Sequence, residues 1–179
     1  MACGKSVRGL RSLSALFRNR QVHKTYLCLV YGEVKSKGIL TGYLTKDNKT
    51  NQVTVSTDSR EKAKEIVTEY EPLKTGVFTD GTKVTLLHAS PVTGRTHQIR
   101  AHMAWAGHAL VGDRKYGKEK ELRWCDETLH LRHQLLHCRY LVFPTEVSEL
   151  PALSGKRIEA PVPAAFEQII RMIDWGENQ

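Results

Sequence analysis

The segment from His23 to Glu33 constrains the fold of this chain more than any other. It reads HKTYLCLVYGE, and nearly every residue after Lys24 is apolar, aromatic or β-branched. A run of this composition predicts a strand with both faces buried, because a strand with one wet face would alternate apolar and polar residues. The chain is therefore expected to contain a sheet with other structure packed on both sides.

Shorter strand-like segments accompany this one, and turn signals separate them. The loop KDNKTN carries Asn and Asp turn chemistry, and the pair Asp80 and Gly81 is typical of a hairpin turn. Strands joined by short turns pair with their neighbours, which predicts antiparallel ladders. The expected strands are Gly38–Leu44, Gln52–Thr57, Ile66–Leu73, Thr82–Ala89, Leu135–Pro144 and Arg157–Ala160.

Three segments have the apolar periodicity of a helix. Ser6–Asn19 is expected to pack one face on the sheet and to present arginines on the other, either as a solvated face or as an RNA contact. Thr96–Trp105 is expected to begin with Thr96 as its N-cap. The third helix is Ala164–Trp175, whose isoleucines share one face.

These elements predict an α+β fold with a mixed, mainly antiparallel sheet and packed helices. The remaining segment, Lys115–Thr128, is charged and is expected to be loop or loose helix. A length of 179 residues, with 40% hydrophobic and 26% charged residues, suits one domain over residues 1–179.

The chain is basic, with a net charge of +8 and a pI near 9.4. The first 35 residues contain seven Lys or Arg and one acid, Glu33. Such a charge favours nucleic acid or an anionic membrane surface as a partner, while solubility alone is the alternative reading. We expect RNA and no membrane, because the helices lack a wide apolar face and no apolar run approaches about 18 residues.

The cysteines and histidines give no metal pattern. The four cysteines include no CxxC pair, and His133 and His137 with Cys125 and Cys138 match no common zinc spacing. We expect reduced thiols, a cytoplasmic protein and no metal or cofactor.

The stretch PVTGRTHQIRAHMAWAGHALVGDRKYG, residues 91–117, is the strongest candidate for a site. Arg95 and Arg100 are rigid, permanently charged forks, and Gly94 permits a sharp turn just before the expected helix. A donor-rich turn of this kind would bind a carboxylate or a phosphate. An arginine that only anchors the loop is the alternative.

Three blocks of the chain resemble the large-subunit-rRNA family of pseudouridine synthases. GRTHQIRAHMAWAGHALVGDRKYG is similar to the family pattern GRTHQIRVH…GHP(I/V)xGDxxYG and departs from it at Ala101 and Ala109. HKTYLCLVYGEV resembles the K-x-Y-L-x-L-V-x-G strand, and LLHCRYLVFP resembles L-H-A-x-x-L-x-F, with Cys138 in place of alanine. The blocks occur in family order and cover almost the whole chain.

The resemblance implies an enzyme that converts uridine in RNA to pseudouridine without metal or cofactor. Ribosomal RNA is the expected substrate and transfer RNA the alternative. By this matching, Arg95 corresponds to the arginine that pairs with the catalytic carboxylate, and Tyr26 to the tyrosine that lies against the target uracil. Leu136 would line the base pocket, and His97 and Arg100 would bind the RNA.

The family's catalytic aspartate belongs to an HRLD motif, and this sequence contains no HRLD. The chain is therefore expected to be the C-terminal portion of a catalytic domain, with little or no turnover by itself. A non-catalytic RNA-binding module is the alternative. The aspartates present, none in that context, are Asp47, Asp58, Asp80, Asp113, Asp126 and Asp174.

Overall fold

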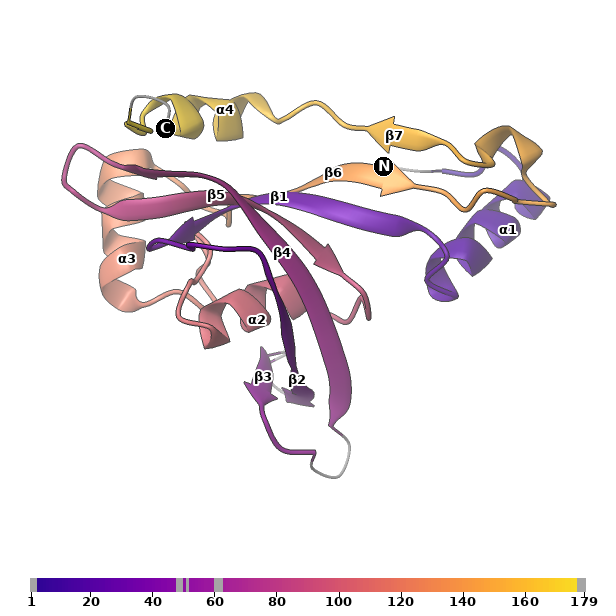
Figure 1. Cartoon of the computed structure of the whole chain (residues 1–179), viewed down its shortest axis with the longest axis horizontal. Helices are drawn as coiled ribbons and strands as arrows, with labels where there is room; N and C mark the ends of the chain where they lie inside the picture. Colours follow the sequence, from indigo (N-terminus) through magenta and orange to yellow (C-terminus); the bar gives the residue numbers. More distant parts are fainter. Residues whose placement is uncertain (1–2, 48–49, 51, 60–62, 177–179) are drawn as a thin grey trace.

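A computed structural model describes residues 3–47, 50, 52–59 and 63–176. Within these residues seven strands form one sheet in the order β3-β2-β4-β5-β1-β6-β7, and every ladder between them is antiparallel (Figure 1). The predicted α+β fold with a mainly antiparallel sheet is confirmed. The strands are β1 (His23–Tyr31), β2 (Gly38–Asp47), β3 (Gln52–Ser56), β4 (Lys64–Val77), β5 (Lys83–Pro91), β6 (Leu136–Val142) and β7 (Arg157–Glu159).

Strand β1 lies inside the sheet between β5 and β6, and both of its faces are buried as its composition predicts. Leu27 and Leu29 face a cluster that includes Phe166 of helix α4 (Ala164–Arg171). On the other face, Cys28 packs with Ile99 of helix α2 (Gln98–Trp105). The sheet is therefore sandwiched between two helices at the position of β1.

Strand β4 is longer than predicted. The sequence indicated Ile66–Leu73, whereas the strand spans Lys64–Val77. Its register against β5 shifts between Pro72 and Lys74. This irregularity accommodates the proline, which has no N–H to donate to a ladder, so pairing resumes beyond it.

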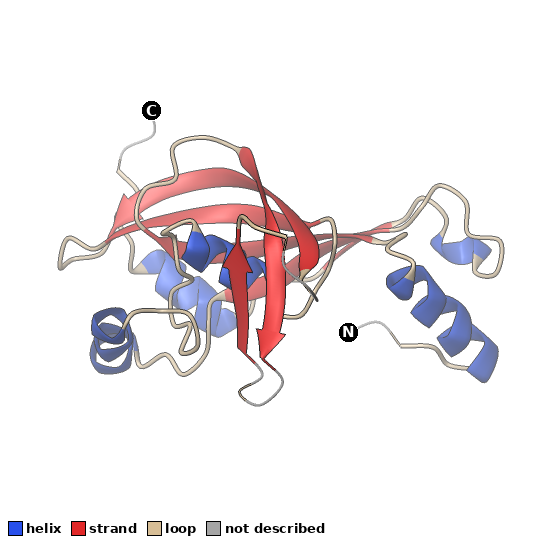
Figure 2. Ribbon diagram, turned by 90° about the horizontal axis from the view of Figure 1, so that it is seen from below, coloured by secondary structure: helices blue, strands red, loops and turns tan. Residues whose placement is uncertain are grey.

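Helix α1 (Val7–Arg18) begins as predicted, because Ser6 Oγ accepts a hydrogen bond of 3.1 Å from the backbone N–H of Gly9. Its packing partner differs from the expectation. Leu13 and Leu16 contact Phe143 and the segment after β6, so the helix lies at one end of the molecule and not on the broad face of the sheet (Figures 1 and 2).

The expected start of α2 was wrong. The helix begins at Gln98, and His97 before it has left-handed backbone with φ of 54°, so Thr96 cannot be the N-cap. The predicted C-terminal helix also ends earlier, at Arg171, because Asp174 forms a bridge with Val77 of β4.

The segment predicted as loop or loose helix contains two short helical elements. They are α3 (Glu119–Trp124) and a π-helical turn, η1 (Cys125–Leu129); a 3-10 turn, η2 (Pro151–Leu153), follows β6. Among the described residues, none of the helices combines the length and apolar composition needed to cross a bilayer.

A buried histidine joins α2 to the sheet. The side chain of His102 is fully buried, and its Nδ1 lies 2.9 Å from the Thr68 hydroxyl of β4. That hydroxyl also accepts a hydrogen bond from Gln98 Nε2, so two side chains of α2 meet at one side chain of β4. Burial lowers the pKa of His102 to about 4.

The lowered pKa predicts that the protein loses stability in mild acid. The unfolded chain takes up a proton near pH 6.5 and the folded chain near pH 4, so stability falls as the pH drops between these values. We expect the free energy of unfolding to fall by about 2 kcal/mol more in the parent than in His102→Gln between about pH 7 and pH 4.5. Denaturant titrations at the two pH values measure this difference, and equal losses in both proteins would contradict it.

Candidate active site

The side chains that the sequence singled out gather around one pocket of about 380 Å³. The pocket lies between β1, the loop after β5, the start of α2 and the residues that lead into β6. All of the predicted site residues contribute to its wall: Tyr26, Arg95, His97, Arg100 and Leu136. The three motifs, far apart in the sequence, therefore meet at a single place.

Tyr26 forms the strand side of the pocket. It is half-buried in β1, on the face that α2 covers. Burial, with a smaller contribution from the thiol of Cys138, raises the pKa of Tyr26 to about 12. At neutral pH the phenol is therefore protonated and can donate a hydrogen bond.

A bulge in β6 sets the residues opposite Tyr26. Tyr26 pairs with Cys138, whereas Thr25 pairs with Tyr140, so Arg139 is an extra residue without a partner on β1. Because of the bulge, Cys138 lies on the pocket face and Tyr140 on the opposite face of the sheet. Arg139 is held instead by an ion pair with Glu159 of β7.

The loop that carries Arg95 is fixed by one buried amide. Oε1 of Gln98 accepts hydrogen bonds from the Thr93 hydroxyl (2.7 Å) and from the backbone N–H of Arg95 (2.8 Å). Its Nε2 donates to the carbonyl of Val67 (2.7 Å) and to the Thr68 hydroxyl (3.0 Å). The side chain of Gln98 thus ties the loop to β4 with all of its strong donor and acceptor positions in use.

Arg95 lies in the turn that this amide holds. Gly94 before it has φ of 58°, a conformation that glycine adopts without strain. The side chain of Arg95 is exposed, and its guanidinium forms neither an ion pair nor a hydrogen bond with any described residue. It is therefore available to an anion that enters the pocket.

Arg100, five residues later, is committed to a partner within the protein. Its Nε and Nη2 donate to the two carboxylate oxygens of Asp113, each at 2.7 Å, and Asp113 is fully buried. The carboxylate also accepts the backbone N–H groups of Lys115 and Tyr116, so it stabilises the turn after Gly112. Asp113 uses two of the five N–H donors of Arg100, and a role for Arg100 in substrate binding stays a prediction.

His97 is positioned by Tyr116. The two side chains meet edge to face, with Nδ1 of His97 3.1 Å from the Tyr116 hydroxyl, which in turn accepts the backbone N–H of Val53 at 3.2 Å. Burial and the charges of Arg100 and Lys115 lower the pKa of His97. The imidazole is therefore neutral at pH 7 and serves as a hydrogen-bonding group.

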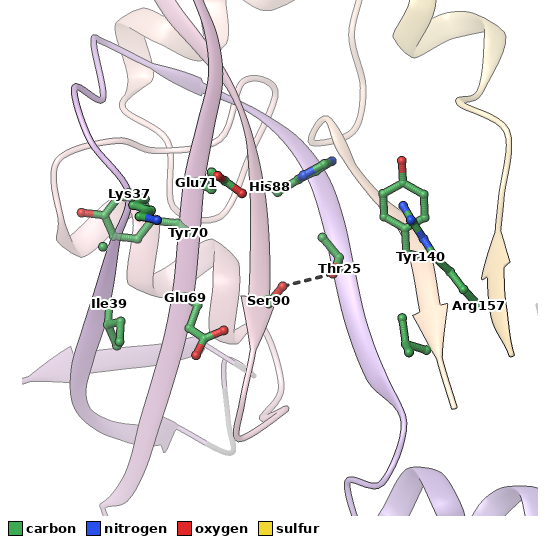
Figure 3. A pocket seen from close by; sticks show the side chains of 12 residues that line it. Thr25, Lys37, Ile39, Glu69, Tyr70, Glu71, His88, Ser90, Tyr140 and Arg157 are labelled. Atoms are coloured by element: carbon green, nitrogen blue, oxygen red, sulfur yellow. Dashed lines mark hydrogen bonds between the residues drawn. The ribbon is translucent and has the colours of Figure 1, made fainter. Parts of the chain in front are cut away.

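A larger hollow of about 750 Å³ lies on the opposite face of the sheet (Figure 3). His88, Tyr140 and Arg157 surround it, and the guanidinium of Arg157 lies 4.0 Å from the centre of the Tyr140 ring. The ring face is already covered by this cation, and neither Tyr26 nor Arg95 reaches the hollow. The smaller pocket is therefore the better candidate for the site.

Comparison with known proteins identifies the family. The family model described as RNA pseudouridylate synthase matches residues 1–105, which is more than half of the chain. The chain belongs to this family. The matched residues include β1 with Tyr26 and the whole of the loop that carries Arg95.

Curated relatives have names of the same kind. An uncharacterized RNA pseudouridine synthase of Helicobacter pylori is 38% identical over 96% of this chain and 56% of its own length. A ribosomal large subunit pseudouridine synthase C of Vibrio vulnificus is 30% identical over 94% of this chain and 50% of its own length. A tRNA pseudouridine synthase C of Vibrio parahaemolyticus is 30% identical over 91% of this chain and 67% of its own length. The chain spans about half the length of the first two.

A solved structure supports the fold. Human RNA Pseudouridylate Synthase Domain Containing 1 superposes with a TM-score of 0.73 at 24% identity, over 95% of this chain and 66% of the human one. At this identity the likeness concerns the fold alone.

Sequence reasoning missed three polar residues of the described pocket lining. Lys24, Gln98 and Gln134 line it beside the predicted residues. Lys24 and Gln98 belong to the motifs K-x-Y-L and GRTHQIR, so the sequence places them near the site. Their contacts could not be predicted, because their partners lie on other elements. Nothing in the local pattern around Gln134 indicated that it faces the pocket.

The network around Gln98 predicts a large effect of its removal. We expect Gln98→Ala to lower the free energy of unfolding by about 3 kcal/mol, because the buried groups of Val67, Thr68 and the Arg95 loop lose their partner. Gln134→Ala is the control and should cost less than about 0.5 kcal/mol, since its amide has no hydrogen bond to a described residue. If Gln98→Ala and Gln134→Ala unfold at the same denaturant concentration, the side-chain amide of Gln98 does not hold the loop.

Proposed function

We propose that the protein isomerises uridine to pseudouridine in RNA and that the target uracil enters the pocket between Tyr26 and Arg95. One observation carries the proposal: an aromatic hydroxyl and an unpaired, exposed guanidinium line the same pocket of about 380 Å³. Such a site offers a flat surface for a base and a cation for a carboxylate.

The reaction requires three events at the sugar and the base. The bond between C1′ and N1 breaks, the uracil turns, and a bond forms between C1′ and C5. C5 then loses a proton and N1 takes one up, so that the product is an isomer of uridine. The nucleotide must leave its stack so that the base can reach a pocket. Tyr26 would stack on the uracil and hold a proton at its hydroxyl, which the raised pKa keeps protonated.

Arg95 would hold a catalytic carboxylate ionised and correctly aimed. The resemblance assigns this carboxylate to the aspartate of the HRLD motif, which the present sequence does not contain. The described lining of the pocket contains no Asp or Glu, and Asp113 nearby is already paired with Arg100. In the proposed ion pair between arginine and the catalytic carboxylate, this chain therefore contributes the guanidinium of Arg95.

We infer that the substrate is ribosomal RNA, with transfer RNA as the alternative. The net charge of +8 supports an RNA partner of either kind. The names of the Vibrio relatives include one of each, and ribosomal RNA is preferred because the three motifs resemble the large-subunit-rRNA family.

A non-catalytic RNA-binding module is the second candidate. It is favoured by the absence of a carboxylate from the described pocket lining and by the basic charge. The two candidates differ in turnover, because a binding module would hold uridine without releasing the proton at C5.

Tritium release from C5 of uridine tests the proposal. We expect the protein as produced from its gene to release tritium from labelled ribosomal RNA transcripts and less from transfer RNA. Arg95→Lys and Tyr26→Phe should each reduce the rate by about 10²-fold or more, because a lysine cannot replace a planar fork and phenylalanine has no proton to hold.

Arg171→Ala, an exposed substitution on α4, is the matched control and should leave the rate unchanged. The 179-residue chain assayed by itself should bind the RNA and release little or no tritium. RNA binding without any tritium release by the gene product would favour the binding module, and release that is insensitive to Arg95→Lys would overturn the assigned site.

A further inference from the structure

The sheet divides into two parts beside the candidate active site. The last Cα pair of the ladder between β1 and β5 is Tyr26 with Ala89, and one further contact joins the strands, between Thr25 Oγ1 and Ser90 Oγ at 3.2 Å (Figure 3). Beyond it, Lys24 and His23 of β1 remain paired with β6, whereas Ser90 and Pro91 of β5 remain paired with β4. The two halves of the sheet therefore separate at this point.

A groove of about 580 Å³ lies where the halves separate, and we name it the fork groove. Lys24, Pro91 and Gly94 belong both to the fork groove and to the Tyr26 pocket, so the two are continuous. At its other end the groove shares Thr25, Glu69 and Ser90 with the larger hollow of Figure 3. The full lining consists of Arg20, Val22, His23, Lys24, Thr25, Glu69, Ser90, Pro91, Val92 and Gly94.

Charge is distributed unevenly along the fork groove. Arg20 and Lys24 form no ion pair with any described residue, and a Cβ placed on Gly94 would lie 3.7 Å from the ammonium of Lys24. That ammonium thus stands at the junction with the Tyr26 pocket. Glu69, the carboxylate in the described lining, belongs to the end shared with the hollow. An anion is therefore favoured at the end next to the pocket.

The backbone of Arg20 supplies an independent observation. Arg20 follows the C-cap Asn19 of α1 and has φ of 58°, the left-handed conformation that glycine usually provides at this position. The residue in this conformation is a long cation, and it is exposed on the wall of the groove. Strained residues of this kind cluster at sites that serve function.

We propose that the fork groove binds the sugar-phosphate backbone of a single RNA strand next to the nucleotide held in the Tyr26 pocket. Lys24 contacts the phosphate nearest the pocket, and Arg20 contacts a further phosphate along the strand. The inference rests on the proposed function, because it assumes that the pocket holds a uridine of RNA. A single strand fits this role because its flexible backbone can follow a groove. A duplex, whose bases are stacked and paired, is too stiff to do so.

Salt dependence of RNA binding tests the fork groove. The probe is a fluorescein-labelled single-stranded oligouridylate, and anisotropy gives the dissociation constant of the 179-residue chain between about 50 and 200 mM KCl. Removal of one cation that neutralises a phosphate should reduce the slope of log K against log salt by about 0.7. We expect this reduction, and about a five- to tenfold loss of affinity at the lower salt, for Arg20→Gly.

Arg20→Gly should keep or raise the melting temperature, because glycine relieves the left-handed strain. Arg20→Gln, which retains the strain and removes the charge, should weaken binding to the same extent. Arg171→Ala removes one positive charge from α4 and should leave the slope unchanged. A duplex of the same length should show equal slopes for the parent and for Arg20→Gly.

Equal slopes for the parent and both Arg20 variants on the single strand would overturn the proposal, as would the same reduction in Arg171→Ala. Either result could occur while the gene product still releases tritium from ribosomal RNA, so the fork groove can fail without the proposed function. A different outcome is that the gene product releases no tritium, while the Arg20 variants still show the reduced salt slope. The fork groove would then be the RNA contact of a non-catalytic binding module.

Discussion

Burial of β1 on both faces is the constraint on which the rest of the structure depends. Helix α4 covers one face and helix α2 the other, so neighbouring residues of the strand are committed to different environments. Tyr26 is directed to the pocket, while Thr25 beside it reaches the opposite hollow. The strand therefore fixes the position of Tyr26 on one face of the sheet, and the loop with Arg95 lies beside it at the same pocket.

Buried polar contacts hold that loop in position and give the two arginines of one motif different roles. Gln98 and Thr68 hold the loop against β4, and burial makes each of their hydrogen bonds costly to lose. Arg100 is paired with the fully buried carboxylate of Asp113 and so stabilises the turn after Gly112. Arg95 remains without a partner among the described residues. The two arginines have the same charge, but they differ in their availability to a ligand. Only their three-dimensional surroundings distinguish them.

The sequence indicated the features that depend on local pattern. The composition of β1 predicted its burial, and the motifs predicted that Tyr26, Arg95 and Leu136 belong to one site, which the pocket now contains. What could not be predicted depends on partners far along the chain. Gln98 bonds to Val67 about thirty positions earlier, and the left-handed His97 is bonded to Tyr116. Helix α1 has clear periodicity, yet its apolar face packs on the segment after β6, since periodicity reveals a buried face and not its neighbour.

The bulge at Arg139 has a consequence for how β6 can change. In a regular strand, residues two apart share a face, but the extra residue separates Cys138 from Tyr140 and lets one short strand supply both sides of the sheet. Point substitutions at either position would act on one side only. Deletion of Arg139 would turn Cys138 and Tyr140 into neighbours in a regular ladder with Tyr26 and Thr25, so both would keep their sides of the sheet, and the ion pair with Glu159 would be lost.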